Sequence, residues 1–347
     1  MLVIRSNVLS TKDCNGQILK LNQERREKIM NTTSCRLLNI GKILSSYPAQ
    51  QCVNGSSSHN LCTLSVSPSV SIFDQKVSIR IHGLPSHGMA TLQAWMHFKW
   101  RGKDILFVSY GRYYADSNGE IDLDRHPSLS GTYTGVDSMG LFWSMGSLPG
   151  HPKDVCMAVP NVQVPILINL ALFSGHITVD ESSIAMKTIT PLCTCTITRL
   201  CKAPDVKRIE IKEGNIRGAL LLPPGNGPFP GVIDMYGGAG GLRDARAGLL
   251  ATRGFATLAL AYFKYQDLPE DITDIRLEYF QVWKSEAHIL CLCGDDDSHS
   301  QSQWLLDLKD CYPEDKQHKI NVVVYPGTGH LLEPPYTPTA CIALALQ

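Results

Sequence analysis

Short apolar runs that alternate with polar positions dominate the chain from Thr63 onward. Val77–Ile81 shows the period of two that a half-buried strand has, and Gly and Pro separate it from further runs at turn-like spacing. The further runs cover residues 90–100, 105–110, 163–172 and 187–200. Several short strands with such turns are typical of an antiparallel sandwich, so we predict an all-β sandwich over residues 61–203.

A different pattern begins near Val206 and predicts a parallel sheet. A hairpin, a buried strand, a helix and a second buried strand follow one another over residues 208–222, 231–235, 243–253 and 255–262. Gly254 stands where the C-cap of that helix would be. Strand, helix and strand at this spacing form a βαβ unit, so we predict an α/β domain over residues 204–347.

Residues 1–60 show no such period, and they end in a stretch rich in Ser, Asn and Gly at 54–60. The segment lacks the apolar core of a signal peptide. Glu24 and Glu27 interrupt what would otherwise be a weak match to a mitochondrial presequence, because such segments avoid acids. We therefore predict a disordered leader over residues 1–60.

Composition and charge restrict the partners of the chain. The 32 Lys and Arg residues balance 32 Asp and Glu residues, which gives no indication of a nucleic-acid partner. No apolar run approaches the roughly 20 residues that a membrane span requires. The 12 cysteines include the pairs Cys193/Cys195 and Cys291/Cys293 within strand-like runs, which favours buried thiols over zinc ligands. We expect a monomer without a metal or other cofactor.

Two strand-like runs near the C-terminus each lead into residues suited to acid–base chemistry. Residues 290–294 run into three aspartates, and residues 320–325 run into a glycine turn followed by His330. An acid after one strand and a histidine after the next form the second half of an α/β-hydrolase triad. A histidine base needs a carboxylate that fixes its tautomer. Asp297 is our first choice for this acid and Asp296 the second; the alternative is a solvated acidic turn.

A glycine-rich loop, Tyr236–Gly241, directly follows the strand predicted at 231–235. It lacks the Gly-Lys-Ser/Thr of a phosphate loop, and a dinucleotide motif would require a glycine where Arg243 stands. Two interpretations remain, a structural turn and an oxyanion loop whose backbone N–H groups bind the acyl oxygen. The oxyanion role would fall to Gly237, Gly238, Ala239 and Gly240.

Five stretches of the chain, taken together, match a known family. They cover residues 128–143, 228–234, 254–262, 277–280 and 325–336. These stretches resemble the family of acyl-CoA thioesterases and bile acid-CoA:amino acid N-acyltransferases. The resemblance implies an N-terminal immunoglobulin-like sandwich, a C-terminal α/β-hydrolase domain and acyl-CoA as the substrate. It carries the acid and the histidine of the family over to Asp297 and His330.

The nucleophile of that family has no counterpart in this sequence. A serine or cysteine should lie on a G-x-S-x-G-type elbow after residues 277–280, but no such elbow exists and Ser285 has none around it. A hydrolase normally places two βα units, or roughly 55 residues, between the strands that end at Tyr262 and begin at Ile289. Here only residues 263–288 separate them, and 268–283 fit the one preceding helix. We predict an incomplete hydrolase domain with no nucleophile and no closing helix.

Two expectations follow from this deletion, and a third concerns the location of the protein. We expect the chain to be inactive or severely impaired as a thioesterase or N-acyltransferase; the alternative is a non-catalytic binding product built on the sandwich. The strand at Ile233 loses its central neighbour, so the α/β part is strained or rearranged while the sandwich is well formed. We expect a cytoplasmic location, although the family also allows peroxisomes or mitochondria, because Leu344–Gln347 is not a Ser-Lys-Leu-type address.

Overall fold

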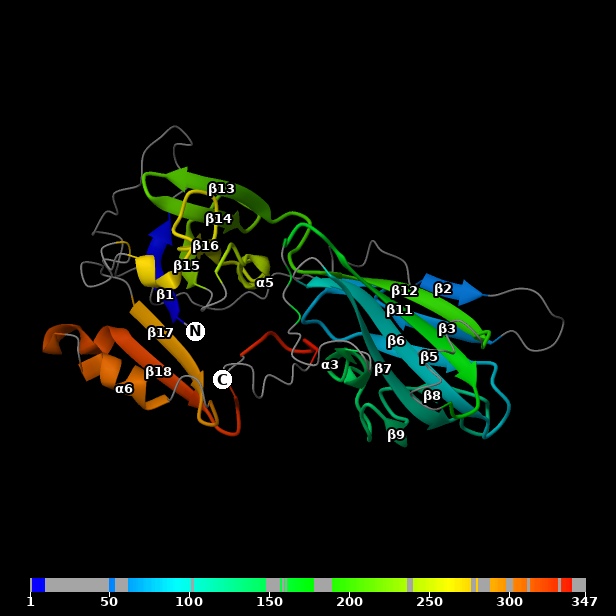
Figure 1. Ribbon diagram of the computed structural model, residues 1–347. Helices are drawn as coiled ribbons and strands as arrows, with labels where there is room; N and C mark the ends of the chain where they lie inside the picture. The colour runs from blue at the N-terminus through cyan, green and yellow to red at the C-terminus, as the bar shows by residue number, and fades with distance from the viewer. Residues whose placement is uncertain are drawn as a thin grey trace. The chain divides into compact units, whose positions relative to one another are not determined.

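The computed structural model contains two compact units, each described by itself (Figure 1). The first unit comprises the described residues within 1–38, 159–163 and 201–333, and we call it the mixed-sheet unit. The second comprises those within 39–158, 164–200 and 334–347, and we call it the two-sheet unit. The structure describes residues 2–9, 50–53, 62–100, 103–147, 157, 159, 161–177, 189–235, 240–275, 279, 288–297, 302–310, 313–329 and 332–338.

The two-sheet unit is almost entirely β-structure. One sheet has the order β2-β3-β5-β8, formed by Gln50–Val53, Thr63–Ser67, Ser78–His82 and Ile121–Asp122. The other has the order β10-β7-β6-β11-β12-β4 with β9 beside β7, formed by Gly146–Ser147, Lys103–Tyr114, Met89–Trp100, Ile166–Ser174, Cys193–Leu200, Val70–Ile72 and Ser130–Gly131. A short helix, α3, covers Gly140–Trp143. All pairs are antiparallel except β12 with β4.

Alternation of apolar and polar residues explains these strands. In β12, Cys193, Cys195 and Ile197 are buried while the threonines between them are exposed or half-buried, which places one face of the strand on the core. The cysteines therefore serve as small apolar residues, as the sequence predicts. The strands predicted at 77–81, 90–100, 105–110, 163–172 and 187–200 are confirmed as β5, β6, β7, β11 and β12.

The mixed-sheet unit has one sheet of order β13-β14-β16-β15-β1-β17-β18. The strands are Lys207–Glu213, Ile216–Leu222, Ala256–Ala261, Phe229–Met235, Leu2–Leu9, His288–Gly294 and Ile320–Tyr325. Helix α5 covers Ala245–Thr252 and helix α6 covers Ser302–Asp310. The predicted hairpin is confirmed as β13 with β14, and the βαβ unit as β15, α5 and β16 with the two strands parallel. Gly254 ends α5 with φ of +94°, a conformation that favours glycine.

Two expectations from the sequence differ from the structure. The sequence predicts a helix over residues 268–283, but 268–275 contain only a 3-10 turn at Ile272–Asp274, whose N-cap Asp271 accepts a hydrogen bond from the backbone of Thr273. Of the remainder, only Tyr279 belongs to the described residues. The sequence also predicts a leader without structure over 1–60, yet β1 and β2 lie within it. β1 pairs with β15 and β17, far along the chain, and a single-sequence pattern does not show such long-range pairing, whereas β2 pairs with the neighbouring β3.

The strand β1 occupies the place where the sequence predicts a missing neighbour. It lies between β15 and β17 and pairs antiparallel with both, as the blue strand in Figure 1 shows. The α/β part is thus rearranged, and the side of β15 that faces β17 carries a ladder of backbone hydrogen bonds. β1 runs opposite to its two neighbours, so its carboxyl end lies at the other edge of the sheet from the carboxyl ends of β15 and β17.

The first prediction concerns an ion pair that ties β14 to the loop after β16. The Arg217 guanidinium donates two hydrogen bonds of 2.6 Å to the Asp267 carboxylate and lowers its pKa from 3.8 to about 2. Because the folded-state pKa is the lower one, the stabilisation is present above pH 3.8 and is lost as the pH falls through about 2. We expect the urea midpoint of the mixed-sheet unit to fall over this window.

Two variants test this assignment separately. Asp267→Asn removes the titrating group, and Arg217→Gln removes the cation that lowers its pKa. Each should flatten the pH dependence of the urea midpoint between pH 3.8 and about 2 relative to the parent chain. An unchanged pH dependence in both variants would show that other carboxylates dominate the acid unfolding of this unit.

Candidate active site

The loops after β17 and β18 lie against each other at one edge of the mixed sheet. The two strands are parallel, with Gly294 paired to Tyr325, so both loops leave the sheet at the same level. The backbone N–H of Asp296 donates to the carbonyl of Thr328 at 3.1 Å, and the N–H of Gly327 donates to the Asp295 carboxylate at 2.6 Å. The segment that contains the predicted acid is therefore bonded to the segment that leads to the predicted histidine.

The predicted acids differ in their surroundings. Asp297 is 8% exposed, whereas Asp295 and Asp296 are exposed to solvent. A buried carboxylate is the kind that orients a catalytic histidine, because its charge is little screened by water. His330 itself lies outside the described residues, which end at Gly329 on this loop. The pairing of Asp297 with His330 thus stays a prediction. It is supported by the hydrogen bonds between the loop that carries Asp297 and the loop that leads to His330.

The close approach of these loops depends on Gly294. A Cβ atom at this position would lie 1.8 Å from the carbonyl oxygen of Thr328 and 2.6 Å from that of Gly329. A side chain there would have to push the acid loop away from the histidine loop. No other residue type fits this backbone contact without a shift.

The predicted oxyanion loop follows the carboxyl end of β15. Gly237, Gly238 and Ala239 lie outside the described residues, but Gly240 is described. Its φ is +68°, and a Cβ atom would lie 2.8 Å from the ring of Phe263, so this position requires glycine on two counts. The N–H of the next residue, Gly241, donates to the carbonyl of Phe263 at 2.9 Å, which holds the end of the loop against the residues after β16.

The strand directions bring the three predicted segments to one edge of the sheet. Because β1 is antiparallel to both β15 and β17, those two strands run the same way, and β16 and β18 run with them. The glycine loop, the acid loop and the histidine loop all follow the carboxyl ends of these strands, which is where α/β sheets place their ligands. β15 and β17 are separated by one strand, or roughly 10 Å.

A buried ion pair that the sequence did not predict lies at the end of β15, directly before the glycine loop. Asp234, 2% exposed, accepts hydrogen bonds from Arg246 on α5, with the nearest nitrogen at 2.6 Å. Arg246 also donates to the carbonyl of Met235, the last residue before the loop, at 3.1 Å. Burial raises the pKa of Asp234 and the positive charge of Arg246 opposes that rise. The feature of the sequence that could have indicated this pair is the single carboxylate, Asp234, inside the otherwise apolar strand β15.

The two cysteines near the acid are poor nucleophiles. Cys291 and Cys293 lie in β17 and both thiols are buried, so burial raises the pKa of each. The nearby Asp297 carboxylate adds to the rise for Cys293. Both precede the acid on its own strand and do not lie on a turn into a helix. The strand between β15 and β17 is β1, which runs the wrong way to present an elbow at the carboxyl edge.

A second prediction tests the contact between the acid loop and the histidine loop. Gly294→Ala should separate the loops and lower the free energy of unfolding of the mixed-sheet unit by about 1–3 kcal/mol, because the added methyl meets backbone oxygen. Hydrogen exchange at the Asp296 amide should accelerate. Gly329→Ala is the matched control, since a Cβ there meets nothing within 4 Å. Equal exchange in both variants would contradict the close packing of these loops.

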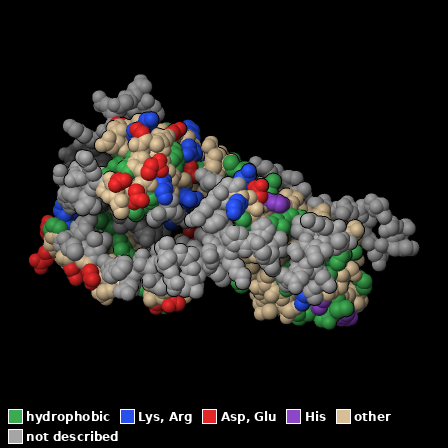
Figure 2. Space-filling view, viewed as in Figure 1, with side chains coloured by type: hydrophobic (Ala, Val, Ile, Leu, Met, Phe, Trp, Pro, Cys, Tyr) green, Lys and Arg blue, Asp and Glu red, His purple; other side chains and the backbone are tan. Residues whose placement is uncertain are grey.

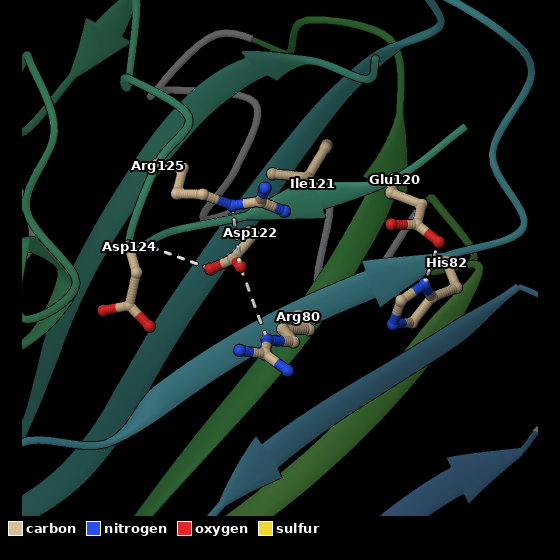
Figure 3. A pocket seen from close by; sticks show the side chains of 7 residues that line it. All are labelled: Arg80, His82, Glu120, Ile121, Asp122, Asp124 and Arg125. Atoms are coloured by element: carbon tan, nitrogen blue, oxygen red, sulfur yellow. Dashed lines mark hydrogen bonds and ion pairs between the residues drawn. The ribbon is translucent and has the colours of Figure 1, made fainter. Parts of the chain in front are cut away.

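A charged depression in the two-sheet unit offers no competing catalytic arrangement. Its volume is about 350 Å³ (Figure 3). The lining residues are Arg80, His82, Glu120, Ile121, Asp122, Asp124 and Arg125. Arg80 and Arg125 both bind Asp122, at 3.4 and 3.2 Å, while His82 lies 3.0 Å from Glu120. The His82–Glu120 pair is partly exposed on both sides, and the lining includes no serine or cysteine. The arginine and aspartate charges are thus paired with each other at the surface, where such pairs are weak.

On the face shown in Figure 2, both acidic and basic side chains are visible over the mixed-sheet unit, without a broad patch of basic residues. The balance agrees with the neutral net charge of the chain. Among the residues that the structure describes, no helix is both long and apolar enough to cross a bilayer.

Two family models match the chain. The sequence model for the acyl-CoA thioester hydrolase/BAAT N-terminal region matches residues 74–213. The model for the BAAT/acyl-CoA thioester hydrolase C terminal matches residues 258–347. Together the two models match more than half of the chain.

Curated mouse proteins also match the chain. Acyl-coenzyme A thioesterase 6 is 42% identical over 220 residues, which is 63% of this chain and 49% of that protein. Bile acid-CoA:amino acid N-acyltransferase is 43% identical over 221 residues, 64% of this chain and 50% of that protein. Peroxisomal succinyl-coenzyme A thioesterase is 41% identical over 220 residues, 63% of this chain and 49% of that protein. The match thus extends over about half the length of each relative. The chain belongs to the acyl-CoA thioester hydrolase and bile acid-CoA:amino acid N-acyltransferase family.

Proposed function

We propose that this chain carries the acid–base half of an acyl-CoA-processing site and lacks the attacking half. In the complete reaction a nucleophile attacks the thioester carbonyl, CoA leaves as its thiol, and an acyl-enzyme forms. Water then releases a fatty acid, or an amino acid such as glycine or taurine releases an amide. His330, oriented by Asp297, would move the proton, and backbone N–H groups near Gly237–Gly240 would hold the oxyanion.

One observation supports this assignment above the others. The loops that follow β17 and β18 are hydrogen-bonded to each other at the carboxyl edge of the sheet, with Asp297 buried on the first and Gly329 on the second. A general base needs to lie within hydrogen-bond reach of its orienting carboxylate, and contact between the two loops is the condition for that. The family match supplies the chemistry for which such a pair is used.

The proposal also assigns a domain to each part of the chain. Residues 61–203 form an immunoglobulin-like sandwich, and residues 204–347 form a partial α/β-hydrolase domain whose elbow region is absent. The two sheets of the two-sheet unit and the parallel pairs β15–β16 and β17–β18 support these assignments. Acyl-CoA is the proposed substrate, as the relatives are named for it. The monomeric state and the cytoplasmic location stay predictions.

A second candidate is a non-catalytic product that binds a partner through the sandwich. The observation in its favour is the antiparallel β1 between β15 and β17, because a strand in this direction offers no elbow for a nucleophile. Both candidates keep the two-sheet unit intact. They differ in what the chain retains: the first candidate keeps an acid–base pair without a nucleophile, and the second has no part in acyl transfer.

A CoA-release assay tests the proposed function. The chain is incubated with palmitoyl-CoA, and separately with choloyl-CoA plus glycine, and thiol release is followed with a chromogenic reagent. We expect no release above that of buffer, in the parent chain and in His330→Ala alike. Release that His330→Ala abolishes would overturn the loss of the nucleophile, whereas release that survives this change would indicate a contaminating enzyme.

A further inference from the structure

The mixed sheet is completed by a strand from the far end of the chain. β1 lies between β15 and β17, and within the described residues no other strand pairs with those two edges (Figure 1). Without β1 the sheet would separate into the group β13-β14-β16-β15 and the pair β17-β18. Two inner edges would then expose unpaired backbone donors and acceptors.

The pairing of β1 is two-sided over its first half. Ile4 stands opposite Ile233 on one side and Ile289 on the other, and Leu2 stands opposite Met235 and Cys291. Beyond Arg5 only β15 remains as a partner, and the register shifts between Ser6 and Leu9. The segment Leu2–Arg5 therefore makes the contacts of a central strand, whereas the rest makes those of an edge strand.

The neighbours of β1 are built as interior strands. Val232 of β15 is 6% exposed, and Ile289 and Cys291 of β17 are 4% and 0% exposed. Ile289 and Cys291 also pack in one apolar cluster with Ile320 of β18. These residues are buried with β1 in the gap. Without it, β15 and β17 would become edge strands that lack the charges or proline by which natural proteins protect such edges.

The sequence of β1 fits a strand that binds mainly through its backbone. Leu2–Leu9 contains β-branched residues such as Val3 and Ile4, one charged residue, and neither Gly nor Pro. Every other antiparallel pair of this sheet joins β13, β14 and β16, which lie close together in the chain. β1 alone among the described strands of the sheet reaches its partners from a remote segment.

We propose that the gap between β15 and β17 is a strand-binding site whose ligand is an extended peptide with the sequence of residues 2–9. Backbone hydrogen bonds on both sides provide the affinity, as in strand addition to a sheet, and Leu2–Arg5 form the central part of the ligand. In the intact chain the site is filled by its own segment. Among the described strands, β17 is joined to β15 only through this ligand. The inference does not depend on any acyl transfer.

Peptide binding tests the proposal in trans. A variant lacking residues 2–9 is titrated with a fluorescent peptide of sequence LVIRSNVL, followed by anisotropy. We expect saturable binding, and no binding by the same peptide with proline at the third position, because proline removes a ladder donor and does not fit a central strand. The intact chain should bind at least about tenfold more weakly, since its own tethered strand competes at high effective concentration.

Hydrogen exchange tests it in cis and does not require the shortened chain to fold. Ile4→Pro in the intact chain should accelerate exchange of the amides in 229–235 and 288–291 about tenfold or more, while β6 and β7 of the two-sheet unit serve as an internal reference. Asn7→Pro is the matched control, because this position falls in the register shift, pairs with no residue of β17 and should change exchange less.

The two experiments together decide the question. If the shortened chain aggregates alone, refolding it with the parent peptide but not with the proline peptide supports the site. Equal exchange in the parent chain and Ile4→Pro overturns the proposal. Equal binding of the two peptides to the shortened chain overturns it as well.

Discussion

The kcat for thiol release from palmitoyl-CoA is expected to be lower by a factor on the order of 10⁶ for this chain than for a family member with a complete triad. Removing the nucleophile from a serine triad has about this effect, and removing the remaining members as well adds little. Any residual rate from oxyanion binding lies below the buffer background of the CoA-release assay. The acid and histidine alone have no group to deprotonate.

The physical reason for so large a loss lies in the direction of β1. A hydrolase nucleophile sits at the carboxyl end of a strand, on the turn into a helix. Between β15 and β17 this chain has a strand that runs the opposite way, so its carboxyl end lies at the other edge of the sheet. A rate within a factor of about 10³ of the complete relative, and dependent on His330, would require a nucleophile from elsewhere in the chain.

Arg199→Ala is expected to destabilise the two-sheet unit by about 3–5 kcal/mol. Arg199 lies in β12, is 1% exposed and is the largest fully buried side chain among the described residues. Its guanidinium donates to the Ser71 hydroxyl at 2.5 Å and to the carbonyls of Phe73 and Gln75 at 2.6 Å. The same group lies 5.5 Å from the ring centroid of Phe142.

The loss combines two effects that act in the same direction. Truncation leaves the carbonyl oxygens of buried Phe73 and half-buried Gln75 without their donor, and it leaves a cavity where the side chain was. The free energy of unfolding of Arg199→Lys should lie between those of the parent chain and Arg199→Ala. A lysine keeps the positive charge but not the planar guanidinium that reaches several acceptors. Urea unfolding, followed by a signal from the two-sheet unit, measures both variants.

An exposed arginine supplies the control for this prediction. Arg80 binds Asp122 at 3.4 Å, but its side chain is 57% exposed. Arg80→Ala should change the free energy of unfolding by less than about 1 kcal/mol, since solvent screens such a pair. If the two alanine variants lose the same stability, the burial of Arg199 does not have the energetic role described above.

Patterns of period two and of βαβ spacing predicted the local structure well, and for a physical reason. In β12 and in the β15–α5–β16 unit, the residues that face the core are set by the sequence of the segment itself. The range predicted for the last strand, 320–325, agrees with β18. The same holds for Gly254, whose positive φ follows from its place after a helix.

Pairings between remote segments could not be read from such patterns. The segment Leu2–Leu9 shows no clear alternation, and its role as a central strand is defined by the gap that it fills. The Asp234–Arg246 pair likewise depends on the crossover that brings Arg246 of α5 to the carboxylate in β15. Gly294 appeared as the end of a strand, and only the parallel register with β18 shows that it is a point of loop contact.

Intact-protein mass spectrometry after incubation with palmitoyl-CoA tests the central claim most directly. A triad with a nucleophile forms a covalent acyl-enzyme, which appears as one added acyl group that acid quenching preserves. We predict that the parent chain and His330→Ala give the same spectrum, without a stoichiometric acyl adduct. One acyl group per chain in the parent, absent in His330→Ala, would contradict the account by revealing an attacking residue that depends on this histidine.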